Sequence, residues 1–253
     1  MSPLLRVVLL YALVPVAFTV VGAATGAYWP ALRRARSHVL HLAAGVVFAV
    51  IAVELLPEIL RRALVRDVVL GFASGIGTML VVDRVLDRIR GGDDDDDEST
   101  RAHGEARATV GLTLLAAVGI DFLLDGLLLG VGFAAGARIG ILLALAEAAE
   151  QLSVGLALSG ELLAAGVARL RVVAIVSALG SLVFLSAVLG ATVLSGLTGG
   201  AMEAVLSFGL AALLYLVTEE LLREAHEERE SATGTAMFFL GFLIFLVIGM
   251  TLD

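Results

Sequence analysis

The chain alternates between long apolar stretches and short polar connections. Eight stretches carry few charges, and each has the roughly 20 residues that a helix needs to cross the hydrocarbon core of a bilayer. Their expected bounds are 5–28, 38–60, 66–86, 108–134, 138–163, 169–195, 200–222 and 232–252. The pattern predicts an all-α integral membrane protein with eight transmembrane helices, which form a single domain over residues 1–253.

Composition supports this class of protein and limits its chemistry. Hydrophobic residues make up 59% of the chain and the mean hydropathy is +1.00, well above the values of soluble domains. The chain has no cysteine, so any metal would meet only oxygen or imidazole ligands. The basic residues form no patch interleaved with aromatic residues, so nucleic acid is not an expected partner. The hydropathy makes the lipid bilayer the expected partner instead.

The arginines predict the orientation. An even number of spans places both termini on one side, and every basic residue of the chain other than histidine is an arginine. Five lie on the terminal side and twelve on the other side. Positive charge gathers in cytoplasmic loops, so the N- and C-termini are expected outside the cell membrane.

The connection at 91–107 is strongly acidic and is expected to be a cytoplasmic loop between the third and fourth helices. It contains Asp93 to Asp97, followed by Glu98 and His103. Blocks of like charge are usually solvated linkers, which is the simpler interpretation. The functional alternative is a weak trap for cations.

Acidic side chains interrupt two of the apolar stretches. Asp121 and Asp125 are four residues apart and share one helical face, and Glu147, Glu150 and Gln151 form a similar stripe on the next span. From the helical rise, both stripes lie near the middle or the outer half of the membrane. Buried charges there are costly unless a cation, shared protons or water compensates them. The spacing therefore predicts an oxygen-rich metal site.

The stripes have a simpler interpretation, and further acids stand near the ends of two other spans. The acids could instead be protonated or hydrogen-bonded packing groups, although no arginine lies inside these spans to pair with them. Glu54 and Glu58 flank Pro57 near the outer end of the second span, while Glu219 and Glu220 stand at the inner end of the seventh. These four acids are candidates for the mouths of a pathway. Glu224 and His226 stand at the same inner end of the seventh span, and His41, near the inner start of the second, is a candidate proton acceptor or weak ligand. Each is also compatible with an ordinary structural role.

The second and seventh spans carry motifs that resemble the ZIP family of divalent metal transporters. The second runs from His41 to the sequence Glu-Leu-Leu-Pro-Glu at 54–58. The seventh contains Thr218-Glu219-Glu220-Leu-Leu-Arg223-Glu224, with arginine in place of the usual proline. Eight spans, external termini and a variable internal loop after the third span are similar to this family as well.

The fourth and fifth spans resemble the metal-binding helices of the same family, with substitutions. The family pattern His-Asn-x-Pro-Glu-Gly matches the stretch at 120–126, where Asp121 and Asp125 stand in place of Asn and Glu. The fifth-helix motif aligns with residues 146–151, which keep Glu147, Glu150 and Gln151. Histidine and proline are missing from both motifs, and the acidic position of helix six falls near Val183. Without imidazole ligands, the preference of such a site for metal ions moves toward harder ions.

The resemblance implies a transporter, with the metal ion as its substrate and no prosthetic group. It would import zinc or a harder ion such as manganese, iron or cadmium by alternating access through an intramembrane carboxylate site. The alternatives are a metal or proton sensor without flux and, less favoured, an intramembrane aspartate-dependent enzyme; the leading interpretation is not an enzyme. A homodimer is suggested by the family and by glycine-rich helix faces, and neither requires it.

Overall fold

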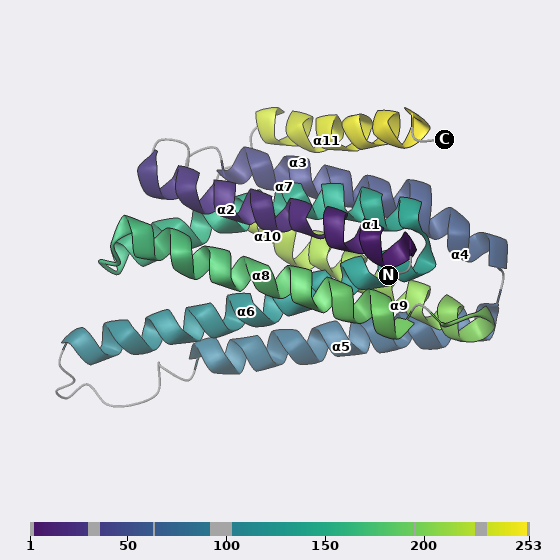
Figure 1. Cartoon of the computed structure of the whole chain (residues 1–253), viewed down its shortest axis with the longest axis horizontal. Helices are drawn as coiled ribbons and strands as arrows, with labels where there is room; N and C mark the ends of the chain where they lie inside the picture. The colour runs from purple at the N-terminus through teal and green to yellow at the C-terminus, as the bar shows by residue number, and fades with distance from the viewer. Residues whose placement is uncertain are drawn as a thin grey trace.

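The computed structural model describes residues 3–29, 36–62, 64–91, 103–194, 196–225 and 232–251 (Figure 1). Within these ranges the secondary structure is helical, with no strand. The elements are α1 (Pro3–Tyr11), α2 (Leu13–Tyr28), α3 (Arg36–Val50), η2 (Ile51–Leu55), α4 (Leu56–Arg62), α5 (Val65–Gly91), α6 (His103–Ala135), α7 (Ala137–Ala164), α8 (Arg169–Leu194), α9 (Gly199–Tyr215), η3 (Leu216–Leu221), α10 (Leu222–Ala225) and α11 (Ala232–Thr251).

Eight segments of these ranges are long and apolar enough to cross a membrane, which confirms the predicted number. They are Leu5–Tyr28, Arg36–Arg61, Val65–Val85, Leu114–Ala135, Ala137–Ala164, Arg169–Leu194, Gly199–Glu219 and Ala232–Thr251. The chain is therefore a multi-pass membrane protein, and both of its ends lie toward the same end of the bundle (Figure 1).

The acidic loop predicted at 91–107 ends earlier than expected. Helix α5 continues to Gly91 and α6 already begins at His103, so residues 103–107 belong to a helix. The aspartates at 93–97, together with Glu98, lie outside the described residues, as does His226.

The second span widens into a π-helical turn, η2, just before Pro57. The backbone N–H of Leu56 donates to the carbonyl of Ile51, five residues earlier. Pro57 explains this widening, because its ring lacks an N–H and would clash with the carbonyl four residues before it. Glu54 lies in this turn, so its position differs from that in a regular helix.

The seventh span contains a second π-helical segment, η3. The backbone N–H of Leu222 donates to the carbonyl of Val217. No proline is present here, and Thr218 Oγ1 instead donates to the carbonyls of Leu214 and Tyr215 at 2.9 and 3.3 Å. A hydroxyl that bonds to the preceding turn competes with the backbone ladder, which favours local widening.

The helices pack as two bundles. In the first bundle, α2 packs on α7 and α6 packs on α8, with α1 alongside. In the second bundle, α3 packs on α11 and α5 packs on α9; η2, α4, η3 and α10 extend these helices. The bundles meet where α3 contacts α7 and where α9 contacts α6. Helices α6 and α7, which carry the predicted metal ligands, therefore face the second bundle.

Glycines let helix backbones approach closely within each bundle. A β-carbon on Gly22 of α2 would lie 2.3 Å from the carbonyl oxygen of Leu152, and one on Gly155 would lie 2.5 Å from that of Thr19. Such distances are too short for any larger residue. This close approach of α2 and α7 places Thr19 beside the polar stripe of α7.

Candidate metal site

The acidic stripes of α6 and α7 are buried inside the protein. Asp125, Glu147, Glu150 and Gln151 are 2%, 3%, 2% and 0% exposed, whereas Asp121 is half-buried. Each stripe follows from the predicted helical spacing, because residues three and four apart share a face. The four residues therefore avoid lipid and point into the protein, where polar groups in membrane helices are functional more often than elsewhere.

A chain of hydrogen bonds joins three helices at this site. Gln151 Nε2 donates to Asp125 Oδ2 at 2.8 Å, which links α7 to α6. Thr19 Oγ1 of α2 lies 3.0 Å from Gln151 Oε1 and 2.9 Å from the carbonyl oxygen of Pro15, and it donates to these acceptors. The amide of Gln151 is thereby oriented so that its nitrogen faces Asp125. Thr19 was not expected from the sequence, since a threonine in an apolar helix carries no distinctive signal.

Glu147 differs from Asp125 in its surroundings. Neither of its carboxylate oxygens is exposed, and neither receives a hydrogen bond from the part of the chain that the structure describes. Asp121 lies close enough to Glu147 for the two carboxyl groups to interact electrostatically. A buried carboxylate without donors is costly, and a second acid beside it adds repulsion when both are ionised. This pair would gain from a bound positive charge.

Four of the five predicted ligands form two pairs in this conformation, and the fifth, Glu150, is buried on the same helix as Glu147. One pair is Asp125 with Gln151, and the other is Asp121 with Glu147. Among the residues that the structure describes, no three histidine, aspartate or glutamate side chains gather closely enough to hold a metal ion. A compact cage of acids is therefore not present in this conformation, and metal binding stays a prediction.

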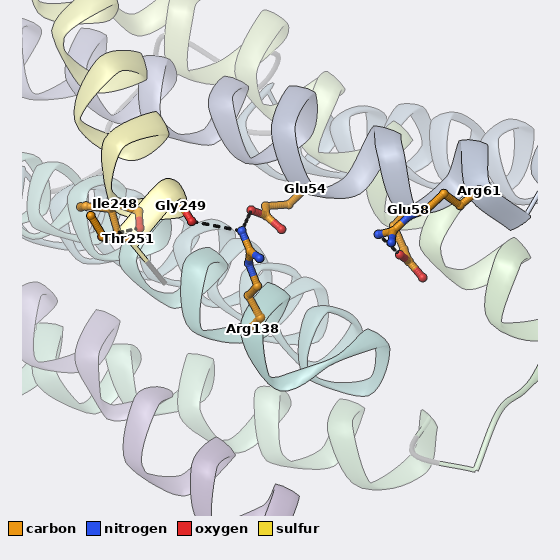
Figure 2. Close-up of polar contacts among 7 residues, drawn as sticks. All are labelled: Glu54, Glu58, Arg61, Arg138, Ile248, Gly249 and Thr251. Carbon is orange, nitrogen blue, oxygen red and sulfur yellow. Dashed lines mark hydrogen bonds and ion pairs between the residues drawn. The ribbon is translucent and has the colours of Figure 1, made fainter. Parts of the chain in front are cut away.

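The acids predicted at the pathway mouths have different environments. Glu54 pairs with Arg138 at 3.1 Å, and Glu58 pairs with Arg61 of its own helix (Figure 2). Glu219 is exposed, and the side chain of Glu220 lies outside the described atoms, as does that of Glu224. The two acids of the second span are thus engaged in ion pairs at the end of the protein that carries the chain termini.

His41 is buried and bonds within its own helix. Its Nδ1 lies 2.8 Å from the carbonyl oxygen of Ser37, so this nitrogen carries the proton. The ring packs against Gly234 of α11, where a β-carbon would lie 3.0 Å from ring carbon Cε1. This geometry fits the structural role that the sequence left open for His41.

Glu203 is a buried acid that sequence reasoning missed. It lies in α9 and is fully buried, and Ser207, one turn further along, is fully buried as well. The stripes of α6 and α7 drew attention because each contains two acids, whereas Glu203 is a single acid near a helix start. The sequence did indicate that Glu203 is unusual, because this acid interrupts the apolar sequence Ala-Met-Glu-Ala-Val-Leu at 201–206.

Replacing Thr19 with valine should lower stability by about 1 kcal/mol, because the Gln151 carbonyl loses its donor while shape is retained. Thermal unfolding in detergent measures the change. Thr78→Val is the matched control: this exposed threonine bonds to the carbonyl of Ser74 in its own helix. Equal shifts for the two variants would show that the bond between Thr19 and Gln151 contributes nothing specific.

Comparison of the sequence with models of known protein families and with curated proteins finds no match.

Proposed function

We propose that this protein carries a divalent metal cation across the membrane by alternating access. The observation that supports this most strongly is the buried Glu147, whose oxygens receive no hydrogen bond from the described residues and which lies beside Asp121. Burying such groups within a membrane-spanning bundle is costly, and unsatisfied buried groups often mark an ion or water site. A transported cation would supply the missing positive charge.

The chain offers little positive charge of its own to these acids. Between residues 108 and 163, the only arginine is Arg138, and its side chain contacts Glu54 and the Gly249 carbonyl at the end of the bundle. The two spans that carry the stripes therefore place no other arginine beside these acids. A cation or protons from solution would supply further positive charge, and a transporter exchanges either of them.

The donor set favours a divalent ion with a preference for oxygen. Asp121, Asp125, Glu147, Glu150 and the Gln151 carbonyl would present carboxylate and amide oxygens only. Such ligands suit manganese, iron and magnesium better than soft thiolate-seeking ions, while zinc and cadmium also accept carboxylates. We propose zinc or a harder divalent ion as the substrate, which the protein imports with its termini outside the cell membrane.

Binding would require a local rearrangement of the two pairs. In the present conformation the amide nitrogen of Gln151 faces Asp125. Rotation of this amide would turn its oxygen toward the site and free Asp125 to join Glu147, which lies on the adjacent helix. The two bundles provide the larger motion, because one can rock against the other around a site near the middle of the membrane.

Uptake into liposomes tests the proposal. The purified protein is reconstituted with an internal metal-sensitive dye, and Zn²⁺, Cd²⁺, Mn²⁺, Fe²⁺ and Mg²⁺ are added outside in turn. We expect saturable uptake of at least one ion above that of protein-free liposomes. Rates that match protein-free liposomes for all five ions would overturn divalent transport.

A second candidate is a proton pathway or proton sensor that uses the same acids. It is favoured by one observation: no three acidic or histidine side chains of the described chain gather at a metal-binding distance. An internal pH-sensitive dye in the same liposomes distinguishes the two functions. Acidification under a proton gradient without metal uptake would favour the proton pathway, and neither signal would favour a sensor.

A further inference from the structure

Arg138 joins the two bundles at the end of the protein that carries the chain termini. It is the second residue of α7, in the first bundle, and Figure 2 shows it between two groups of the second bundle. Its Nη2 lies 3.1 Å from Glu54 Oε1 in η2 and donates to the carbonyl oxygen of Gly249 in α11 at 3.1 Å. One guanidinium group thus holds α7 to both η2 and α11.

The partners of Arg138 are suited to a cation for independent reasons. Gly249 lies in the last turn of α11, where carbonyls lack partners within the helix and the helix dipole is negative. Glu54 is held in the π-helical turn that Pro57 imposes, and its side chain is only 10% exposed. The Nη2 group of Arg138 carries two N–H bonds, so it can donate to both acceptors at once.

We propose that Arg138 is an ionic latch that keeps the protein closed toward the side of its termini. Opening on this side moves α7 away from η2 and α11, so it breaks the contact with Glu54 and the contact with Gly249 together. The latch regulates access to the carboxylate site, and its physiological meaning rests on the proposed transport. The latch itself is tested without any transport measurement.

The chain offers a matched ion pair that does not join the bundles. Arg61 pairs with Glu58 three residues earlier, within α4 (Figure 2). This pair also joins an arginine to a glutamate near the same end of the protein. Its loss leaves the contact between the bundles unchanged, so Arg61→Gln is the control for Arg138→Gln.

Cysteine labelling measures how often this end opens. The chain has no cysteine, so Val50→Cys introduces one reporter; Val50 is fully buried in α3, one turn before Glu54. Reconstituted protein is treated with a membrane-impermeant thiol reagent on each side in turn. We expect Arg138→Gln to speed labelling from the terminal side about five-fold or more, as expected for loss of charged hydrogen bonds. Glu54→Gln should have a smaller effect because the Gly249 contact remains.

Two further measurements make the test specific. Arg138→Lys keeps the charge and should restore labelling most of the way to the slow rate of the Val50→Cys protein. Salt should accelerate labelling when Arg138 is present, because its side chain is 40% exposed and the ion pair is screened, and should change labelling less in Arg138→Gln.

The outcomes separate the latch from the transport proposal. Faster labelling in Arg138→Gln but not in Arg61→Gln supports the latch, whether or not metal uptake is observed. Equal labelling of the Val50→Cys protein with Arg138, Arg138→Gln or Glu54→Gln would overturn it, even if uptake is demonstrated. Size-exclusion chromatography of each variant confirms that the comparison concerns folded protein.

Discussion

Asp125→Asn and Glu150→Gln should each lower metal uptake by more than about 100-fold, the upper end of the loss seen when only an outer partner of a metal ligand is removed. Both substitutions keep the size of the side chain and remove one negative charge. Asparagine can still accept the hydrogen bond from Gln151, so the link between α6 and α7 is retained. The loss would therefore report on charge rather than on packing.

The control for this experiment lies on the same helix. Glu161 is exposed near the end of α7, so Glu161→Gln changes the same kind of charge away from the buried stripe. Initial rates of uptake into liposomes are compared at equal amounts of reconstituted protein. Uptake by Asp125→Asn and Glu150→Gln at the rate of Glu161→Gln would remove these acids from the transport site.

Gly71→Ala should destabilise the protein by about 1–3 kcal/mol, because overpacking a close helix contact forces the backbones apart. A β-carbon at this position would lie 2.1 Å from the carbonyl oxygen of Ala204, where α5 packs on α9. Neither backbone can yield without disturbing its own hydrogen bonds. Thermal unfolding in detergent measures the loss as a lower melting temperature.

Gly77→Ala is the matched control on the same helix and should have the opposite sign. Nothing lies within 4 Å of a β-carbon at Gly77, and the position is exposed. Alanine loses less conformational entropy in a helix than glycine, by about 0.5–1 kcal/mol, so the melting temperature should rise slightly. A similar decrease for both variants would mean that the contact between α5 and α9 adapts freely.

The polar pairs of the site were only partly accessible to sequence reasoning. Helical spacing placed Asp125 and Gln151 on the inner faces of neighbouring helices, since this depends on local geometry alone. It could not show that the amide of Gln151 bonds to Asp125, because that depends on the rotation of α6 and α7 about their axes. Thr19 enters through the close approach of α2 at Gly22 and Gly155, a contact between segments far apart in the chain.

The same distinction holds for the ends of the helices. Glu54 was assigned to the outer end of the second span from the sequence, and residue 138 begins the expected fifth span, yet nothing local indicated that Glu54 and Arg138 meet. Residues 54 and 138 come together because α3 packs on α7 across the two bundles. Pairing of charges over such sequence separations is a property of tertiary packing.

By itself, the sequence determined that this is a membrane protein with eight helices long and apolar enough to cross a bilayer, and that two of them carry stripes of acids. Hydropathy and helical periodicity suffice for this, because a bilayer allows few structures other than the helix and requires a span of about 20 residues. The tertiary structure alone decided how the acids pair, that Glu203 is buried, and that Arg138 joins the bundles. These features depend on which helix faces meet, and that choice is made by contacts between distant segments.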